Sequence, residues 1–209
     1  MARIGIICAM GKEFALLSHE AFKSANVRCE LSGIGKANAA MAAQKLIDEF
    51  HPDCILSIGC AGSYNGKIHE GDLIIASQSA YHDAWSGNSY EPGQIAGMPR
   101  YFNSDPGLLK AAALCYPDAR TGLLITGDQF YLSEEEDARQ KSLYPDALAV
   151  DMEGAAVAQV AFKRNIPFLA LKVISDTHLD GRQRERYDDF WRTLAPAAFK
   201  EIHRIIEAL

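Results

Sequence analysis

The residues best suited to chemistry in this chain are acids that follow apolar segments. Glu13 follows the apolar segment 3–9, Glu153 follows the segment 147–151, and Asp176 comes directly after the segment 167–175. A carboxyl group can donate a proton, take one up, or accept hydrogen bonds from hydroxyl groups. If these segments are strands of an α/β sheet, one cleft beyond their carboxyl ends gathers all three acids. Taken singly, each acid also fits the first turn of a helix or a turn after a strand.

The elements that must position these acids follow from the hydrophobic pattern. Short β-rich segments alternate with longer helical patterns, and runs such as 54–58 and 73–76 are nearly continuously apolar, as expected of strands covered on both faces. We predict a single domain, 1–209, of the α/β class: a three-layer α/β/α sandwich around a central mixed, mostly parallel sheet. The predicted strands are 3–9, 27–31, 53–59, 72–77, 122–126, 147–151 and 167–175. The predicted helices are 13–25, 36–50, 106–114, 133–144, 153–163 and 187–208.

Composition narrows the class of protein further. The formal net charge of -6 and a pI of about 5.5 argue against a nucleic-acid partner. No segment has the roughly 18 consecutive apolar residues that a membrane span requires, so we expect no membrane partner. The five cysteines form an odd set without a C-x-x-C pair, which is typical of reduced thiols and indicates a cytoplasmic protein.

Several other chemistries lack their motifs. G-x-S-x-G is absent, and the six histidines show no H-E-x-x-H spacing, so we expect neither a metal nor another cofactor. Residues 32–36 (SGIGK) resemble a phosphate loop, but Asn38 stands where a dinucleotide fingerprint needs its third glycine. A Rossmann oxidoreductase is therefore the weakest alternative. We interpret Cys60 as a small buried residue in a tight glycine turn.

Several collinear motifs carry a family resemblance that runs from the first predicted strand to the last predicted helix. In chain order they are residues 4–10 (IGIICAM) with Glu13, 32–36 (SGIGK), 59–62 (GCAG), 71–72 (GD) with Ser77, 81–83 (YHD), 126–130 (TGDQF), 150–153 (VDME) and 174–176 (ISD). Together they resemble the 5′-methylthioadenosine/S-adenosylhomocysteine nucleosidases of the purine nucleoside phosphorylase superfamily. The resemblance implies hydrolysis of an adenine nucleoside to free adenine and a 5′-substituted ribose.

The resemblance implies two catalytic residues. Asp176 matches the aspartate that protonates or hydrogen-bonds N7 of adenine, and Glu13 matches the carboxylate that activates the attacking water. Cleavage of an N-glycosidic bond develops positive charge on the sugar and negative charge on the departing purine. An acid and a base on opposite faces of the sugar suit that change, as they do in inverting glycosidases.

The resemblance also implies the contacts to the substrate. Glu153 would accept hydrogen bonds from the ribose 2′- and 3′-hydroxyls, because an ionised carboxylate only accepts. Phe130 would stack on adenine, and the backbone at Tyr131 would read the purine edge. An apolar pocket for the ribose and the 5′-alkylthio group would come from Met10, Met152 and Tyr187.

Other implied positions are polar or belong to a second subunit. Ser175 precedes the acid Asp176, and Ser77 would lie near the catalytic water or the ribose. Lys172 stands where the family has an arginine that helps to orient the water. The partner's pocket would be completed by Met98, Pro99 and Tyr101, which implies a homodimer.

The sequence departs from the family pattern in two segments. Gly11 and Lys12 stand where relatives usually carry acids, and the segment 177–186 is unusually charged. These departures leave the preferred 5′ substituent open.

Three alternative functions remain open. A phosphorylase of the same fold would carry an arginine where this chain has Ser57. An aminofutalosine or futalosine hydrolase would act on a related nucleoside, and aminofutalosine also carries adenine. A non-catalytic nucleoside-binding protein would have no need to retain Glu13, Glu153 and Asp176 together.

Overall fold

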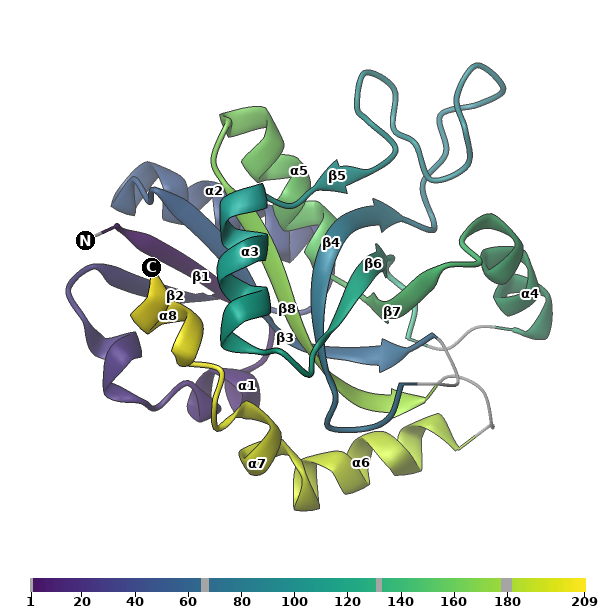
Figure 1. The fold of residues 1–209 in the computed structure, drawn as a ribbon. Coiled ribbons are helices and arrows are strands. Elements are labelled where there is room, and N and C mark those ends of the chain that lie inside the picture. The colour runs from purple at the N-terminus through teal and green to yellow at the C-terminus, as the bar shows by residue number, and fades with distance from the viewer. Residues whose placement is uncertain (1, 65–67, 131–132, 178–181) are drawn as a thin grey trace.

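A mixed sheet with helices on both faces makes up the fold (Figure 1). The computed structural model describes residues 2–64, 68–130, 133–177 and 182–209. The described strands are β1 (Ile4–Cys8), β2 (Val27–Leu31), β3 (Cys54–Ser63), β4 (Leu73–Tyr81), β5 (Phe102–Asn103), β6 (Arg120–Thr126), β7 (Ala147–Asp151) and β8 (Phe168–Thr177). The described helices are α1 (Gly11–Leu16), the 3-10 helix η1 (Glu20–Lys23), α2 (Lys36–Phe50), α3 (Pro106–Cys115), α4 (Glu134–Leu143), α5 (Gly154–Arg164), α6 (Gln183–Thr193), α7 (Ala195–Phe199) and α8 (Arg204–Ala208).

Strands β3 and β4 each pair with three other strands. Strand β3 pairs in parallel with β1 and β8 and antiparallel with β7, while β2 extends the sheet beyond β1. Strand β4 pairs in parallel with β6 and antiparallel with β5 and β8, and β6 pairs in parallel with β7. The ladders from β3 through β8, β4, β6 and β7 return to β3, so this part of the sheet closes on itself. The predicted mixed, mostly parallel sheet is therefore confirmed.

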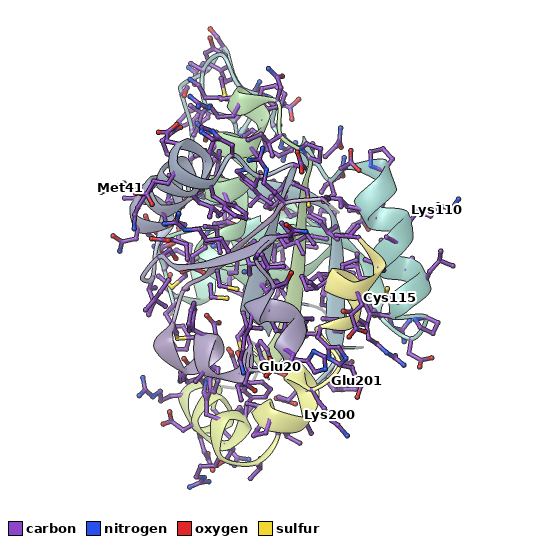
Figure 2. The ribbon with its side chains drawn as sticks, turned by 90° about the vertical axis from the view of Figure 1, so that its left-hand side faces the viewer. Glu20, Met41, Lys110, Cys115, Lys200 and Glu201 are labelled. Atoms are coloured by element: carbon purple, nitrogen blue, oxygen red, sulfur yellow. The ribbon has the colours of Figure 1, made fainter. Side chains whose placement is uncertain are left out.

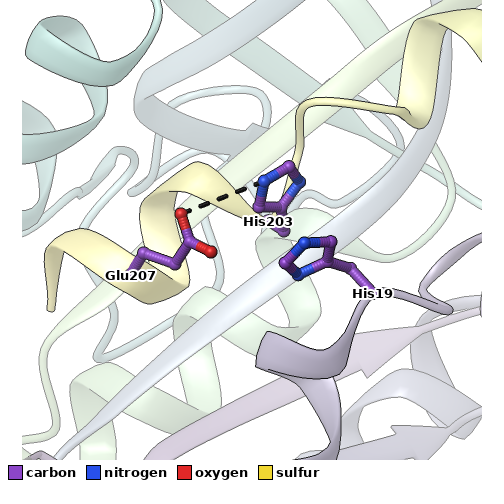
Figure 3. Close-up of side chains that lie close together, drawn as sticks. All are labelled: His19, His203 and Glu207. Carbon is purple, nitrogen blue, oxygen red and sulfur yellow. Dashed lines mark ion pairs between the residues drawn. The ribbon is translucent and has the colours of Figure 1, made fainter.

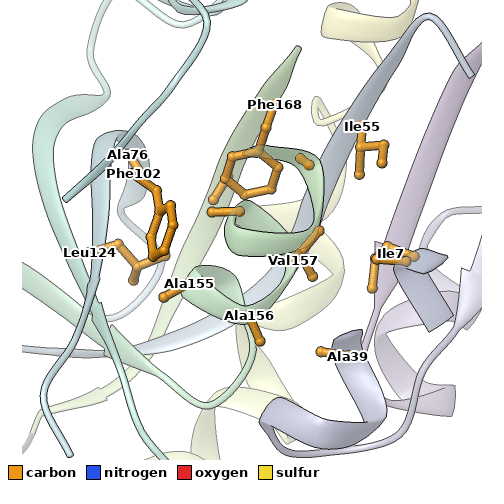
Figure 4. Close-up of a cluster of buried hydrophobic side chains, with 14 of the residues drawn as sticks. Ile7, Ala39, Ile55, Ala76, Phe102, Leu124, Ala155, Ala156, Val157 and Phe168 are labelled. Carbon is orange, nitrogen blue, oxygen red and sulfur yellow. The ribbon is translucent and has the colours of Figure 1, made fainter. Parts of the chain in front are cut away.

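Two apolar clusters hold the helices against the sheet. Helices α2 and α5 bury alanines and branched residues against strand residues such as Ile55 and Leu124 (Figure 4). Helices α3 and α6 to α8 pack with a second set that includes Leu56 and Leu171. Side chains alternate between the faces of a strand, so neighbouring positions of β3 feed different clusters. Met41 on α2 and Lys110 on α3 accordingly lie on opposite sides of the molecule (Figure 2).

Two predicted helices are broken in the structure. The predicted helix 13–25 is wrong: α1 ends after Leu16, and a separate turn, η1, begins after His19, whose Nδ1 accepts a hydrogen bond from the Ala21 N–H. The predicted helix 187–208 is also wrong, since it starts four residues earlier and divides into α6, α7 and α8. Pro196 lacks an N–H and lies in the first turn of α7, where it cannot continue α6.

Two predicted strands end too early. Strand β3 continues to Ser63 because it pairs with β8 as far as Thr177 and with β7, so Cys60 lies within a strand and the predicted tight turn there is wrong. Strand β4 continues to Tyr81 because it pairs with β6 throughout. Long-range pairing sets these ends, and local hydrophobic patterns do not report it.

The carboxyl-terminal helices pack against elements near the amino terminus. Helix α8 contributes Ile205 and Ile206 to the second apolar cluster, which also contains Phe22 of η1. His203, just before α8, stacks on His19 with ring centroids 3.7 Å apart and ring planes 16° from parallel (Figure 3). Elements from both ends of the chain therefore belong to the same apolar cluster.

Candidate active site

One pocket collects residues from the ends of several strands. It is lined from segments after β1, β2, β6 and β7, from β3 and β8, and from α6, and encloses about 660 Å³ including space open to solvent. Its lining residues are Ala9, Met10, Glu13, Ile34, Cys60, Ala61, Gly62, Gln129, Phe130, Val150, Asp151, Met152, Glu153, Ser175, Asp176, Gln183 and Tyr187. The three acids singled out from the sequence therefore meet in one cleft.

Glu13 is held in place by backbone donors. It sits in the first turn of α1 with 2% of its surface exposed. Its Oε2 accepts hydrogen bonds from the Ala9 N–H at 3.1 Å and the Met10 N–H at 2.9 Å, and its Oε1 accepts one from the Cys60 N–H at 2.7 Å. Burial raises the pKa of Glu13, against the lowering influence of Lys172 and these backbone bonds. The result is a fixed carboxyl group with increased proton affinity.

Asp176 lies near the end of β8 and is buried. Its Oδ1 accepts a hydrogen bond from Ser175 Oγ at 2.6 Å, and its Oδ2 accepts one from Gln183 Nε2 at 2.9 Å. Gln183 was not singled out from the sequence. It opens α6, seven residues after Asp176, and no local pattern indicates that the chain folds back there. The two donors fix the orientation of the acid in the pocket.

Glu153 caps α5 and is also buried. Its Oε1 accepts a hydrogen bond from the Gly35 N–H at 2.8 Å. Gly35 has a φ of 99°, which an L side chain rarely adopts, so the glycine-rich segment 32–36 serves to present this amide. Burial and the charge of Asp151 raise the pKa of Glu153 to about 7. A carboxyl group that titrates near neutrality in a cleft is a candidate functional group.

Lys172 is an ion-pair partner of Asp151 and does not line the pocket. Its Nζ lies 3.1 Å from Asp151 Oδ2, and both side chains are almost fully buried. Asp151 also accepts hydrogen bonds from Thr126 Oγ1 at 2.5 Å and from the Gly154 N–H at 2.9 Å. Burial lowers the pKa of Lys172, but the carboxylates of Asp151, Glu153 and Glu13 outweigh that effect and raise it. Lys172 thus supplies positive charge from behind the pocket wall.

One wall of the pocket consists of aromatic and sulfur-containing side chains. The rings of Phe130 and Tyr187 meet edge to face with centroids 5.6 Å apart, and the Tyr187 hydroxyl lies 3.2 Å from Met10 Sδ. Met152 lines the pocket as well. These are the residues predicted to contact the base and the 5′ group. Tyr131 lies outside the residues that the structure describes.

Some predicted positions are not brought to this pocket. Ser77 does not line it, because β4 runs antiparallel to β8 and places Ala76 beside Ala170, away from the Ser175 end of β8. Cys60 lines the pocket instead and its N–H holds Glu13. The loop residues predicted for a partner's pocket also lie outside this chain's own pocket: Met98, Pro99 and Tyr101.

One group of potential metal ligands occurs among the described residues, and it lies away from the pocket. His19, His203 and Glu207 have ligand atoms within 4.8 Å of one another (Figure 3). The two imidazole rings are stacked and nearly parallel, and His19 Nδ1 already accepts a hydrogen bond. We assign no metal to this group. No helix in the described part of the chain is long and apolar enough to cross a bilayer.

The fold and the pocket define an α/β enzyme-like site for a small molecule, lined by three buried carboxyl groups and by an aromatic wall. The chain belongs to the phosphorylase superfamily, whose family model matches residues 3–208.

Relatives of known name share almost the whole chain. A 5′-methylthioadenosine/S-adenosylhomocysteine nucleosidase from Staphylococcus saprophyticus is 34% identical over 228 aligned positions, which cover 99% of this chain and 100% of the relative. The nucleosidase of the same name from Aeromonas salmonicida is 34% identical, with coverage of 90% and 91%. The family resemblance predicted from the motifs is therefore confirmed.

Solved structures give the same result for the fold. The nucleosidase from Neisseria meningitidis, solved with methylthio-immucillin-A, superposes with a TM-score of 0.90 at 31% identity and 100% coverage of both chains. The nucleosidase from Colwellia psychrerythraea, solved with adenine, superposes with a TM-score of 0.87 at 28% identity, covering 100% of this chain and 96% of that one.

Proposed function

We propose that this protein hydrolyses the N-glycosidic bond of 5′-methylthioadenosine, S-adenosylhomocysteine or a related adenine nucleoside. The products are adenine and the 5′-substituted ribose. One observation carries the proposal: Glu13, Glu153 and Asp176 come from segments far apart in the sequence and line a single buried cleft. Relatives and solved structures with the same overall fold bear the nucleosidase name.

Each acid has a role that its surroundings support. Asp176, oriented by Ser175 and Gln183, donates a proton or a hydrogen bond to the departing adenine. Glu13 removes a proton from the attacking water, and the raised proton affinity of this buried carboxyl group suits a base. Three backbone donors keep its oxygens at the sugar, so little reorganisation accompanies the step.

The remaining lining residues hold the nucleoside. Ionised Glu153 accepts hydrogen bonds from the ribose hydroxyls, and one of its oxygens is already oriented by Gly35. Phe130 and Tyr187 provide aromatic surface for the base and the sugar. Met10 and Met152 make the pocket apolar, as a 5′-alkylthio group requires.

Water is the nucleophile in this proposal and phosphate is not. Phosphate binding calls for arginine or lysine donors, and no lysine or arginine lines the described pocket. Ser57, at the position where phosphorylases of this fold carry an arginine, is a buried residue of β3. Lys172 is engaged by Asp151. Carboxylates beside the sugar would repel a phosphate dianion.

The same proposal includes the oligomeric state, the cellular location and pathway, and the layered architecture of the fold. We infer a cytoplasmic homodimer in methionine salvage, in which Met98, Pro99 and Tyr101 reach the partner's pocket. These residues belong to the connection between β4 and β5, parts of which project beyond the sheet (Figure 1), and Ile34 lines the pocket while half exposed. The chain is one domain, 1–209, of three layers, which the apolar clusters on both faces of the sheet support.

The test is release of free base. The purified protein is incubated with methylthioadenosine, adenosylhomocysteine, aminofutalosine, adenosine and inosine, with and without phosphate, and the bases are separated and quantified. We expect adenine and free ribose product at full rate without phosphate. Glu13→Gln should lose most of the rate while the exposed control Glu20→Gln retains it. Strict dependence on phosphate, or formation of a ribose 1-phosphate, would overturn the proposal.

A further inference from the structure

A lysine ammonium group lies against the aromatic wall of the pocket. Lys12 Nζ is 4.2 Å from the ring centroid of Tyr187 and 4.0 Å from that of Trp191. Cations at such distances from aromatic faces are attracted by the ring quadrupole. Tyr187 lines the pocket, and its ring also meets Phe130 edge to face. The cation is therefore fixed beside a residue that the substrate must contact.

The local geometry of α1 separates Lys12 from its neighbour Glu13. Successive side chains of a helix point about 100° apart, so Glu13 turns toward Cys60 whereas Lys12 turns toward α6. Met10, just before α1, lies 3.2 Å from the Tyr187 hydroxyl. Lys12 thus stands next to the end of the pocket formed by Met10 and Tyr187, which our proposed function assigns to the 5′ substituent.

No carboxylate of the described residues forms an ion pair with Lys12. The buried or half-buried Lys36 and Lys172 are paired with Asp83 and Asp151, respectively. Asp188, the acid of α6 whose charge acts on Lys12, is itself paired with Arg184 at 3.1 Å. Of the carboxylates whose charge acts on Lys12, Glu13 accepts three backbone hydrogen bonds and Asp188 is paired with Arg184, and neither forms an ion pair with Lys12.

We propose that Lys12, held on Tyr187 and Trp191, forms a subsite for a carboxylate carried by the 5′ substituent of the nucleoside. The inference rests on the proposed function, because it takes the Met10 and Tyr187 end of the pocket to hold that substituent. A tail that passes the face of Tyr187 meets an ammonium group with which no carboxylate of the described residues forms an ion pair. Nucleosides with a carboxylate at the end of a short 5′-thioalkyl chain are then preferred over neutral ones of the same length.

The experiment compares two substrates that differ only in that charge. Adenosine derivatives with a 5′-carboxypropylthio group or the corresponding 5′-carboxamide are assayed for adenine release, and the ratio of their kcat/KM values is measured. The ratio cancels any effect of Lys12 on Glu13, which both substrates share. Lys110→Gln is the matched control, because Lys110 projects outward from α3, a helix that contributes no residue to the pocket lining (Figure 2).

Partly exposed ion pairs are worth up to about 1 kcal/mol, or roughly two- to fivefold in affinity. We expect wild type and Lys110→Gln to favour the carboxylate about threefold, with the preference falling as salt is added. Lys12→Gln should bring the ratio to about one, and Lys12→Glu should invert it. A ratio that both Lys12 variants leave unchanged would overturn the subsite while the nucleosidase activity stands. Absence of adenine release from both substrates would overturn the proposed function, and the subsite with it.

Discussion

The three pocket acids differ in the groups that hold them. Glu13 accepts three backbone N–H bonds, Asp176 accepts side-chain donors from Ser175 and Gln183, and Glu153 accepts one backbone bond from Gly35. Backbone donors are as rigid as the strands and helices that carry them, and Gln183 is itself buried. The arrangement suits a fixed base, an oriented acid, and an acceptor whose other oxygen can receive a hydroxyl.

Replacement of the acid tests its role directly. We expect Asp176→Asn to reduce turnover by about 10² to 10⁴, because the amide cannot transfer a proton to the departing adenine. The amide oxygen can still accept the Gln183 hydrogen bond, so the circular dichroism spectrum and melting temperature should stay near those of wild type. Turnover within a few-fold of wild type would remove Asp176 from the mechanism.

Ionisation of buried Glu153 should lower the free energy of unfolding at alkaline pH. Its pKa is raised from 4.5 to about 7 by burial and the charge of Asp151. A raised folded-state pKa contributes stability that is present below the unfolded pKa and is lost as pH rises through the folded one. Glu153→Gln has no such loss, so its free energy of unfolding should exceed that of wild type by about 1–3 kcal/mol near pH 8.

The pH series supplies the control for Glu153. In urea titrations the difference in free energy of unfolding between Glu153→Gln and wild type should shrink steadily toward about pH 5. Position 153 is then neutral in the folded state of both proteins. The Gly35 hydrogen bond survives because the amide oxygen still accepts it. A difference that is constant across the pH range would contradict the raised pKa of Glu153.

Among the elements, β3 contributes most to the site through its backbone. Gly59 lies where an added Cβ would be 2.7 Å from Glu13 Oε1, and the next residue donates to that same oxygen. Strand β3 can therefore pass close to the carboxyl group only because this position has no side chain. The glycine is needed for the approach of Glu13 and not for an unusual backbone angle.

Gly59→Ala should displace Glu13 and lower kcat by about 10- to 100-fold, since misplacement of a reacting group by about 1 Å can cost that much. Gly11→Ala is the matched control: a Cβ there meets nothing within 4 Å, and the residue begins the same helix that carries Glu13. Stopped assays of adenine release should show the control at the wild-type rate. Equal activity of both variants would show that the position of Glu13 does not matter.

At the scale of the whole molecule, exposed apolar side chains are candidates for the interface of the proposed dimer. Trp85 is 59% exposed and Met41 is 73% exposed. Large apolar side chains that are exposed on a monomer can be buried when a second subunit binds. Leu114, on α3, is 76% exposed but belongs to a different region, so it offers a comparison.

We expect light scattering to give twice the chain mass of 22.9 kDa for the wild type. Trp85→Glu should shift the protein toward the monomer and reduce activity, since a charge placed in an interface must be desolvated. Leu114→Glu should leave both the mass and the activity unchanged. A fully active monomer of wild type at the assay concentration would exclude the proposed dimer.

Much of the site could be predicted from the sequence because its acids stand at fixed distances from apolar segments. Glu13 follows β1 and Asp176 lies near the end of β8, and both strands pair in parallel with β3, so their carboxyl ends meet at one edge. Glu153 follows β7, which is antiparallel to β3, so its arrival in the same cleft depends on tertiary pairing. Strand and helix cores such as 27–31, 36–50 and 147–151 were also recoverable, since their patterns depend only on neighbouring residues. Local chemistry thus determined which groups are present and roughly where each element lies.

Tertiary structure alone decided which of these groups meet. The pairing of β3 with β7 and β8 carried Cys60 into the pocket, while the antiparallel pairing of β4 with β8 took Ser77 to the other end of the strand. Lys172 reached Asp151 and not Glu13, and Gln183 reached Asp176, through folding of the chain between distant residues. Such contacts depend on register and on where strands and helices end. Those features are set by pairing and burial across the whole sheet, which no short segment of sequence contains.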